Sequence, residues 1–204
     1  MINTIIFDMG GVLLRTEDQE PRAKLARRLG MTYEELEQRV YSSRDAMTGK
    51  IDAETHKRSV LRSLGLPEDG MSDFGDEFWG GDRMDAELLD FIRGLRSDYT
   101  TVLLSNAWDD LRALLVKYWK IADAFDHIFI SAEMGLAKPD PMIYRAVEEE
   151  LQKDPVEMIF VDDFIENVEA AREAGWQAVH FQSREGALAE LAEYLDNAPE
   201  TLSG

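Results

Sequence analysis

Apolar positions along the chain follow two different spacings, and their alternation predicts a repeated strand–helix pattern. Short runs of β-branched and aromatic residues, bounded by glycine, asparagine or aspartate, are typical of buried strands. Longer stretches with apolar residues three or four positions apart are typical of amphipathic helices. We expect strands over residues 4–7, 101–104, 127–130, 158–161 and 177–181. We expect helices over residues 85–96, 108–118, 141–151, 166–174 and 185–194.

This order predicts an α/β fold: a doubly wound, Rossmann-like parallel sheet of five strands or more, with helices on both faces. Residues 16–82 depart from the alternation because they show helical spacing and no strand. Helices are expected there over residues 18–29, 33–44, 52–64 and 71–78. We interpret this stretch as a small helical bundle inserted after the first strand, over the strand ends.

The predicted division is therefore a core domain of residues 1–15 and 83–204 and a helical cap domain of residues 16–82. Residues 197–204 are expected to fray. Arg44 and His56, on helices of the bundle, are expected to face solvent, whereas His127 and His180 in the core strands are expected to be packed.

The composition excludes some classes of binding partner and of site. The 204 residues carry 22 Lys and Arg against 41 Asp and Glu, a formal charge of −19, and 45% are hydrophobic, enough for a buried core. This charge argues against nucleic acid or an anionic membrane surface as the main partner. The absence of cysteine excludes disulfides, thiolate metal sites and a cysteine nucleophile. No apolar run approaches the ~20 residues of a membrane span, and the acidic start does not suit a signal peptide. We expect a cytoplasmic protein, either monomer or homodimer.

Carboxylates stand at the ends of two predicted strands. Asp8 follows the first strand and precedes two glycines, and such a residue ligates a cation, acts as a nucleophile, or only forms a turn. Asp162 and Asp163 follow the fourth strand, where two adjacent carboxylates need a cation or a proton. A simple helix cap would also explain Asp163. The carboxyl ends of parallel strands meet at one edge of a sheet, where such folds bind their ligands.

Other polar residues are predicted at the same edge. Ser105 ends the second strand and is suited either to hold a phosphate oxygen or to form a turn. Lys138, followed by Pro139 and Pro141, either neutralises carboxylate and phosphate there or is solvated in its loop. Asn167 would lie in the first turn of a helix, close to the acidic pair. Oxygen ligands of this kind suit Mg²⁺.

Together these residues form four ordered motifs: Asp-x-Gly-Gly-Val at 8–12, Leu-Leu-Ser-Asn at 103–106, Lys-Pro-Asp-Pro at 138–141 and Val-Asp-Asp-x-x-x-Asn-Val at 161–168. The chain resembles the haloacid dehalogenase superfamily of phosphohydrolases over essentially its whole length. The inserted bundle resembles the first type of helical cap in that family.

The resemblance implies a Mg²⁺-dependent phosphatase that forms an aspartyl-phosphate on Asp8. It implies catalytic roles for Asp8, Ser105 and Lys138, and phosphoryl binding by Ser105 and Lys138 together with Asn106. The remaining implied positions concern the metal: Asp8, the Gly10 backbone carbonyl and Asp163 as ligands, with Asp162 and Asn167 ordering their surroundings.

One position departs from the family pattern. The usual first motif is Asp-x-Asp, whose second aspartate acts as general acid and base, and Gly10 stands there instead. Either a water or a cap residue supplies the proton, or the leaving group is a good one, such as the anomeric oxygen of a sugar 1-phosphate, or the protein turns over weakly. Two alternatives remain: a weak or inactive binding module, and a metal-independent 2-haloacid dehalogenase, against which the paired aspartates argue.

The substrate is expected to be a small phosphorylated metabolite, with sugar phosphates among the candidates. Arg15 is expected either to reach a substrate anion or to pair with Glu17 or Asp18. Trp79 is expected either to pack at the hinge of the insert or to form a wall of the substrate pocket, and Trp108 is expected near the site as a packing residue.

Overall fold

The computed structural model describes residues 1–196 and contains a five-stranded, fully parallel sheet in the order β5-β4-β1-β6-β7. The predicted α/β fold class is confirmed, and each of these strands lies within one residue of its predicted bounds. Residues 197–204, expected to fray, lie outside the described part. The strands are β1 (Thr4–Phe7), β4 (Thr100–Ser105), β5 (His127–Ile130), β6 (Met158–Asp162) and β7 (Gln177–His180).

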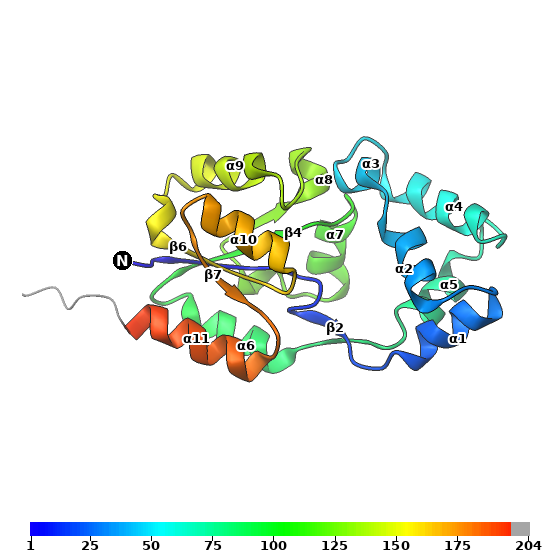
Figure 1. The fold of residues 1–204 in the computed structure, drawn as a ribbon, viewed down its shortest axis with the longest axis horizontal. Coiled ribbons are helices and arrows are strands. Elements are labelled where there is room, and N and C mark those ends of the chain that lie inside the picture. The colour runs from blue at the N-terminus through cyan, green and yellow to red at the C-terminus, as the bar shows by residue number, and fades with distance from the viewer. Residues whose placement is uncertain (197–204) are drawn as a thin grey trace, which may run out of the picture.

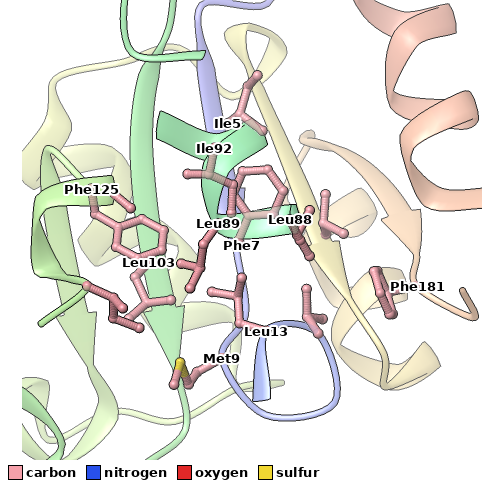
Figure 2. Close-up of a cluster of buried hydrophobic side chains, with 14 of the residues drawn as sticks. Ile5, Phe7, Met9, Leu13, Leu88, Leu89, Ile92, Leu103, Phe125 and Phe181 are labelled. Atoms are coloured by element: carbon pink, nitrogen blue, oxygen red, sulfur yellow. The ribbon is translucent and has the colours of Figure 1, made fainter. Parts of the chain in front are cut away.

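Helices cover both faces of this sheet (Figure 1). On β1, Ile5 and Phe7 join the apolar cluster on one face, whereas Ile6 joins the cluster on the other. Figure 2 shows the first of these clusters, where Phe7 lies against Leu88 and Leu89. Both faces of the strand are therefore buried, which explains its continuous apolar run. The covering helices are α6 (Ala86–Leu95) and α11 (Arg184–Asp196) on one face, and α9 (Pro141–Leu151) and α10 (Ile165–Glu173) on the other.

The helix predicted over residues 108–118 is shorter and irregular. The chain forms only α7 (Leu111–Ala113) and then a π-helical turn, η1 (Leu114–Tyr118). This arrangement buries Leu111 and Leu115 and leaves Tyr118 exposed. The remaining short elements of the core are η2 (Ala122–Ala124), α8 (Ser131–Met134) and η3 (Pro155–Glu157).

A two-stranded antiparallel ribbon, which the sequence did not predict, joins the sheet to the inserted helices. It pairs β2 (Leu14–Thr16) with β3 (Asp82–Met84), and three residues are too few to establish a strand period. Gly81 precedes β3 and lies close to the Asp18 backbone. A Cβ at Gly81 would lie 1.7 Å from the Asp18 carbonyl oxygen, so a larger residue does not fit there without a shift of the backbone. The division into two domains stays a prediction.

The helices of the insert build a separate apolar cluster to one side of the sheet (Figure 1). The helix predicted over residues 33–44 is broken, because the Ser43 hydroxyl accepts the Ala46 N–H and starts a new helix. The helices are α1 (Glu20–Arg28), α2 (Tyr33–Tyr41), α3 (Arg44–Met47), α4 (Ala53–Ser63) and α5 (Met71–Phe78).

The expectation for His56 was wrong. It is buried, and its Nε2 lies 2.8 Å from the Val40 carbonyl oxygen, so this contact links α4 to α2. Arg44 is exposed as expected, and His127 is exposed although it was expected to be packed.

The segment after β4 fastens the insert to the sheet. The Ala53 N–H donates to Asp109 Oδ1 at 2.8 Å, and the Lys57 ammonium pairs with Asp110. The Trp108 ring lies 4.8 Å from the His56 ring, measured between centroids. These contacts place α2 and α4 over the carboxyl ends of the strands. Among the described residues, no helix has the length and apolar character needed to cross a membrane.

Asp85 ties the ribbon, α6 and α11 together. Its Oδ1 accepts the Leu88 N–H at 2.9 Å, and its oxygens pair with Arg15 and Arg184 at 2.7 Å each. Burial alone would raise the pKa of Asp85, but the Leu88 N–H and the two guanidiniums outweigh burial and hold it below the usual value.

We expect Asp85→Ala to lower the free energy of unfolding at neutral pH by roughly 2–4 kcal/mol, because it removes a helix cap and the buried carboxylate that both guanidiniums contact. Since the folded-state pKa is depressed, this contribution is present above the unfolded pKa of about 4 and is lost as the pH falls through the folded value. Urea unfolding at neutral and acid pH measures both effects. Asp52→Ala, which removes the exposed cap of α4, is the control, and an equal loss in both variants would contradict the prediction.

Candidate active site

Three adjacent strands end in polar residues at one edge of the sheet. Asp8 follows β1, Ser105 ends β4 and Asp162 ends β6, and β1 pairs with both of the other strands. All three residues are buried. The parallel register thus brings together side chains that lie far apart in the sequence.

The Lys138 ammonium lies at the centre of this edge. Its Nζ is 2.9 Å from Asp8 Oδ1 and 2.6 Å from Asp162 Oδ2, and it donates to the Leu104 carbonyl at 2.9 Å. These three acceptors match its three hydrogens. Burial alone would lower the pKa of Lys138, but the two carboxylates outweigh burial and raise it. The side chain is fully buried and remains charged.

Asn106 holds the backbone of the loop that carries Lys138. Its Oδ1 accepts the Lys138 N–H, and its Nδ2 donates to the Lys138 carbonyl, both at 2.8 Å. The peptide that follows, Lys138–Pro139, is cis. Asn106 lines the cavity described below, and substrate binding by it stays a prediction.

Asp162 has its bonding capacity filled. Its Oδ1 accepts the Phe164 N–H at 2.8 Å and Asn167 Nδ2 at 2.9 Å, and its Oδ2 accepts Asn167 Nδ2 at 3.1 Å in addition to Lys138. The structure therefore places Asn167 beside the paired aspartates. Asp162 holds its neighbours in position and has little left to offer a further ligand.

Asp163 differs from Asp162 in its hydrogen bonding. Its Oδ1 is buried and finds no hydrogen-bond partner among the described residues. Burial, and then the charge of Asp162, raise the pKa of Asp163 to about 6. Gly11 permits this placement, because a Cβ there would lie 2.0 Å from Asp163 Oδ2, and its φ of 72° also favours glycine.

His180 supports the Asp163 backbone and was not expected to do so. Its Nε2 lies 3.0 Å from the Asp163 carbonyl oxygen, so the ring donates there. His180 pairs in register with Asp162 across β6 and β7. That register is the signal that would have placed it near the site.

Asp8 keeps one carboxylate oxygen free. Its Oδ1 accepts the Met9 N–H at 2.7 Å and the Lys138 ammonium, whereas no donor contacts its Oδ2 within residues 1–196. Burial raises the pKa of Asp8 to about 7, against the lowering effect of Lys138 and with a further raising effect of Asp162.

The free oxygens suit a divalent cation. One oxygen each of Asp8, Asp162 and Asp163 lies within 4.8 Å of the others. Because Asp162 is already bonded, the ligands on offer are Asp8, Asp163 and the carbonyl of Gly10, which is exposed beside them. An all-oxygen set with an unpaired buried carboxylate oxygen fits Mg²⁺.

A cavity of about 890 Å³ opens above these residues. Asp8, Ser105 and Lys138 line its floor, and the Ser105 hydroxyl makes no hydrogen bond to the described residues. Tyr41 and Trp79 of the insert line its wall; a wall position was one of the two expected for Trp79, whereas Tyr41 was not predicted there. The lining on the sheet side includes Phe164 and Glu166, which were also missed.

Arg15 also lines this cavity, but its guanidinium is engaged. It pairs with Asp85 at 2.7 Å and with Glu17 at 3.6 Å, and it donates to the Val12 carbonyl. The ion pair expected with Glu17 is therefore present, while the shorter pair with Asp85 was not predicted. Trp108, expected as a packing residue, packs against the insert.

Comparison with curated proteins finds several relatives. A sesquiterpene phosphatase of Aspergillus oryzae is 29% identical over 200 residues, which are 93% of this chain and 95% of that protein. A D-ribitol-5-phosphate phosphatase of Bacteroides thetaiotaomicron is 27% identical over 203 residues, 92% of this chain and 94% of that protein. The bifunctional epoxide hydrolase 2 of Rattus norvegicus is 28% identical over 147 residues, 69% of this chain, but these span only 26% of that protein.

A solved structure matches as well. A HAD family enzyme of Bacteroides thetaiotaomicron, an aspartate-to-alanine mutant in complex with magnesium and inorganic phosphate, superposes with a TM-score of 0.72 at 27% identity. The match covers 88% of this chain and 93% of that one. A family model for haloacid dehalogenase-like hydrolases matches residues 2–175. The chain belongs to the haloacid dehalogenase-like hydrolases.

Proposed function

We propose that this protein is a Mg²⁺-dependent phosphatase that hydrolyses a small phosphorylated metabolite through an aspartyl-phosphate on Asp8. The observation that carries the proposal is the pair of unbonded carboxylate oxygens, on Asp8 and Asp163, at the floor of the cavity. In a dehalogenase that works without a metal, no cation would bind the buried, unpaired oxygen of Asp163. The names of the fungal and bacterial phosphatases, and the magnesium and phosphate of the similar structure, support the same conclusion.

Asp8 is the proposed nucleophile because one oxygen is held and the other is free. The Lys138 ammonium and the Met9 N–H hold the carboxylate in place, so that it attacks phosphorus while the ester P–O bond breaks; the leaving oxygen takes the bonding electron pair and a proton from water. Water then attacks the same phosphorus, and the Asp8 carboxylate leaves with the bonding electron pair. Inorganic phosphate and the free carboxylate result.

Other residues of the edge bind charge and hold geometry. Lys138 offsets the negative charge of Asp8, which otherwise would repel a phosphate dianion. The free Ser105 hydroxyl is placed to donate to a phosphoryl oxygen. Asp8, the Gly10 carbonyl and Asp163 would hold Mg²⁺, which supplies positive charge to the phosphoryl group when bound. That Arg15 and Asn106 contact the substrate directly stays a prediction.

Gly10 leaves space at the position where the family pattern has a general acid and base. A Cβ at Gly10 would meet no atom within 4 Å, and its φ lies outside the left-handed region. The Cβ of a larger residue therefore meets no clash at this position. The proposed enzyme works without a carboxyl group at this position.

We expect Asp8→Asn to lower Mg²⁺-dependent phosphate release from a panel of small esters by about 1,000-fold or more, because the amide cannot attack phosphorus. Asp98→Asn, which changes an exposed carboxylate away from the cavity, is the control. Phosphate release that survives in Asp8→Asn, or halide release from a 2-haloacid without Mg²⁺, would overturn the proposal.

The raised pKa values of Asp8 and Asp163 predict how Mg²⁺ stabilises the protein. Without metal, the folded state holds protons that the unfolded state has already lost, so stability falls as the pH rises from about 4 through 6 and 7. Mg²⁺ competes with these protons. We therefore expect the increase in Tm on adding Mg²⁺ to be larger at about pH 8 than at about pH 5.5.

The same thermal measurement on Asp163→Asn tests the ligand assignment. This variant should be more stable than the parent without metal at about pH 8, since it removes a desolvated charge, and should lose most of the Mg²⁺-dependent increase in Tm. An undiminished increase would show that the cation binds elsewhere.

We expect Gly10→Asp to raise kcat for esters of simple alcohols by about tenfold or more, because a carboxyl group there can protonate the leaving oxygen. Gly10→Asn has nearly the same shape but cannot transfer a proton, and it is the control. Equal rates in these two variants would contradict the prediction. Circular dichroism would show whether both variants fold.

A further inference from the structure

The two guanidiniums that line the cavity above the phosphoryl site already have carboxylate partners. Above the phosphoryl site the lining includes two guanidiniums, those of Arg15 and Arg22. Arg22 is buried, pairs with Asp82 at 3.0 Å and with Glu37, and donates to the Phe78 carbonyl at 3.1 Å. Arg15 is engaged with Asp85. Neither group is free to pair with a negative charge on the part of a substrate that leaves.

In this part of the cavity, a carboxylate lacks an ion-pair partner. Glu166 is exposed at the start of α10, lines the cavity and has no ion-pair partner among the described residues. Glu37 and Asp82 line it too, so three carboxylates face two guanidiniums. A carboxylate or second phosphate on the leaving group would meet repulsion here.

Aromatic rings form the walls. Trp79 packs edge-on against Phe78 with centroids 5.0 Å apart, and Tyr41 packs against Phe78 at 5.7 Å. Trp108 lies 6.3 Å from each of the rings of Tyr41 and Trp79. The rings of the wall therefore pack against one another. On the sheet side, Phe164 lines the same cavity and is 60% exposed.

The Tyr41 hydroxyl lines the cavity and has a hydrogen free to donate. The Tyr41 hydroxyl accepts the Trp79 Nε1–H at 3.0 Å, and its own hydrogen finds no acceptor in the described part of the chain. Burial raises the pKa of Tyr41 to about 12, so the hydroxyl is protonated at neutral pH. The Trp79 contact fixes the oxygen and leaves the hydrogen to a ligand.

We propose that the leaving group of the substrate is an uncharged alcohol that packs between the rings of Tyr41 and Trp79 and Phe164, and that the Tyr41 hydroxyl donates to an oxygen on it. The proposal rests on the proposed phosphatase function and names its substrate class: phosphate monoesters of uncharged hydroxyl compounds with a second oxygen. Tyr41 is thus a specificity-determining residue.

A matched pair of esters tests whether a negative charge on the leaving group is disfavoured. Glycerol 3-phosphate and 3-phosphoglycerate are of similar size, and only the second carries a carboxylate. We expect kcat/KM to favour glycerol 3-phosphate by about tenfold or more, and Glu166→Gln to narrow that ratio. Equal or better hydrolysis of 3-phosphoglycerate, or a preference for phosphocholine over glycerol 3-phosphate, would overturn the proposal. If no ester, including p-nitrophenyl phosphate, releases phosphate with Mg²⁺, the proposed function itself fails.

Tyr41→Phe tests the hydrogen bond while keeping the ring. We expect KM for glycerol 3-phosphate to rise by about 5- to 20-fold, with kcat changing less. The rise for phenyl phosphate, which has no second oxygen on its leaving group, should be at least about fivefold smaller. Tyr118→Phe, an exposed tyrosine elsewhere, should leave both esters unchanged. Equal losses for the two esters in Tyr41→Phe would show that the tyrosine only packs.

Discussion

The buried Lys138 ammonium is the charge on which the arrangement of the site depends. Two carboxylates that end neighbouring strands would repel each other in a dry interior, and a single cation between Asp8 and Asp162 makes their burial tolerable. The cation must also stay where it is, and the Asn106 amide ensures this by bonding both the N–H and the carbonyl of Lys138. A side chain at the end of β4 thus sets the position of a charge that comes from the loop after β5. Removing Lys138 would leave two buried carboxylates without this cation, so the site is built as a unit.

Lys138 balances Asp8 and Asp162 but not Asp163, and this imbalance defines the chemistry. The third carboxylate has a buried oxygen with no partner, held in place by the Gly11 backbone below it and by the His180 contact to its carbonyl. A protein with a net charge of −19 has no general attraction for phosphate. Binding an anion therefore requires positive charge at one point, and the free oxygens of Asp8 and Asp163 are where a divalent cation would add it. An acidic composition is compatible with an anionic substrate because binding would depend on the electrostatic potential at the site and not on the net charge of the chain.

The sequence predicted the sheet and its polar edge well, because both follow from local patterns. A fully buried parallel strand reads as an apolar run, and the residue after it lies at the ligand-binding edge whatever the rest of the chain does. Contacts between distant elements were not predictable in this way. That the Asn106 amide holds the Lys138 loop was not predicted, because the two residues lie 32 positions apart. His56 has the same helical spacing as a solvent-facing residue, yet the Val40 carbonyl and the Trp108 ring enclose it. The ribbon of β2 and β3 was missed because three-residue strands carry no period.

The edge of the sheet and the walls of the cavity have different roles in the proposed function. The sheet edge holds groups that suit any phosphate monoester, and nothing in it distinguishes one alcohol from another. In the proposed function, discrimination comes from the walls of the cavity, where Tyr41 and Trp79 of the insert and Phe164 and Glu166 after β6 line the same space. The Arg22 guanidinium lines the cavity too, but it also joins α1 to α2, α5 and β3. The ion pairs of Arg22 that stabilise the helical bundle would thus also keep this guanidinium from a negatively charged leaving group, so that stability and the proposed selectivity would have a common origin.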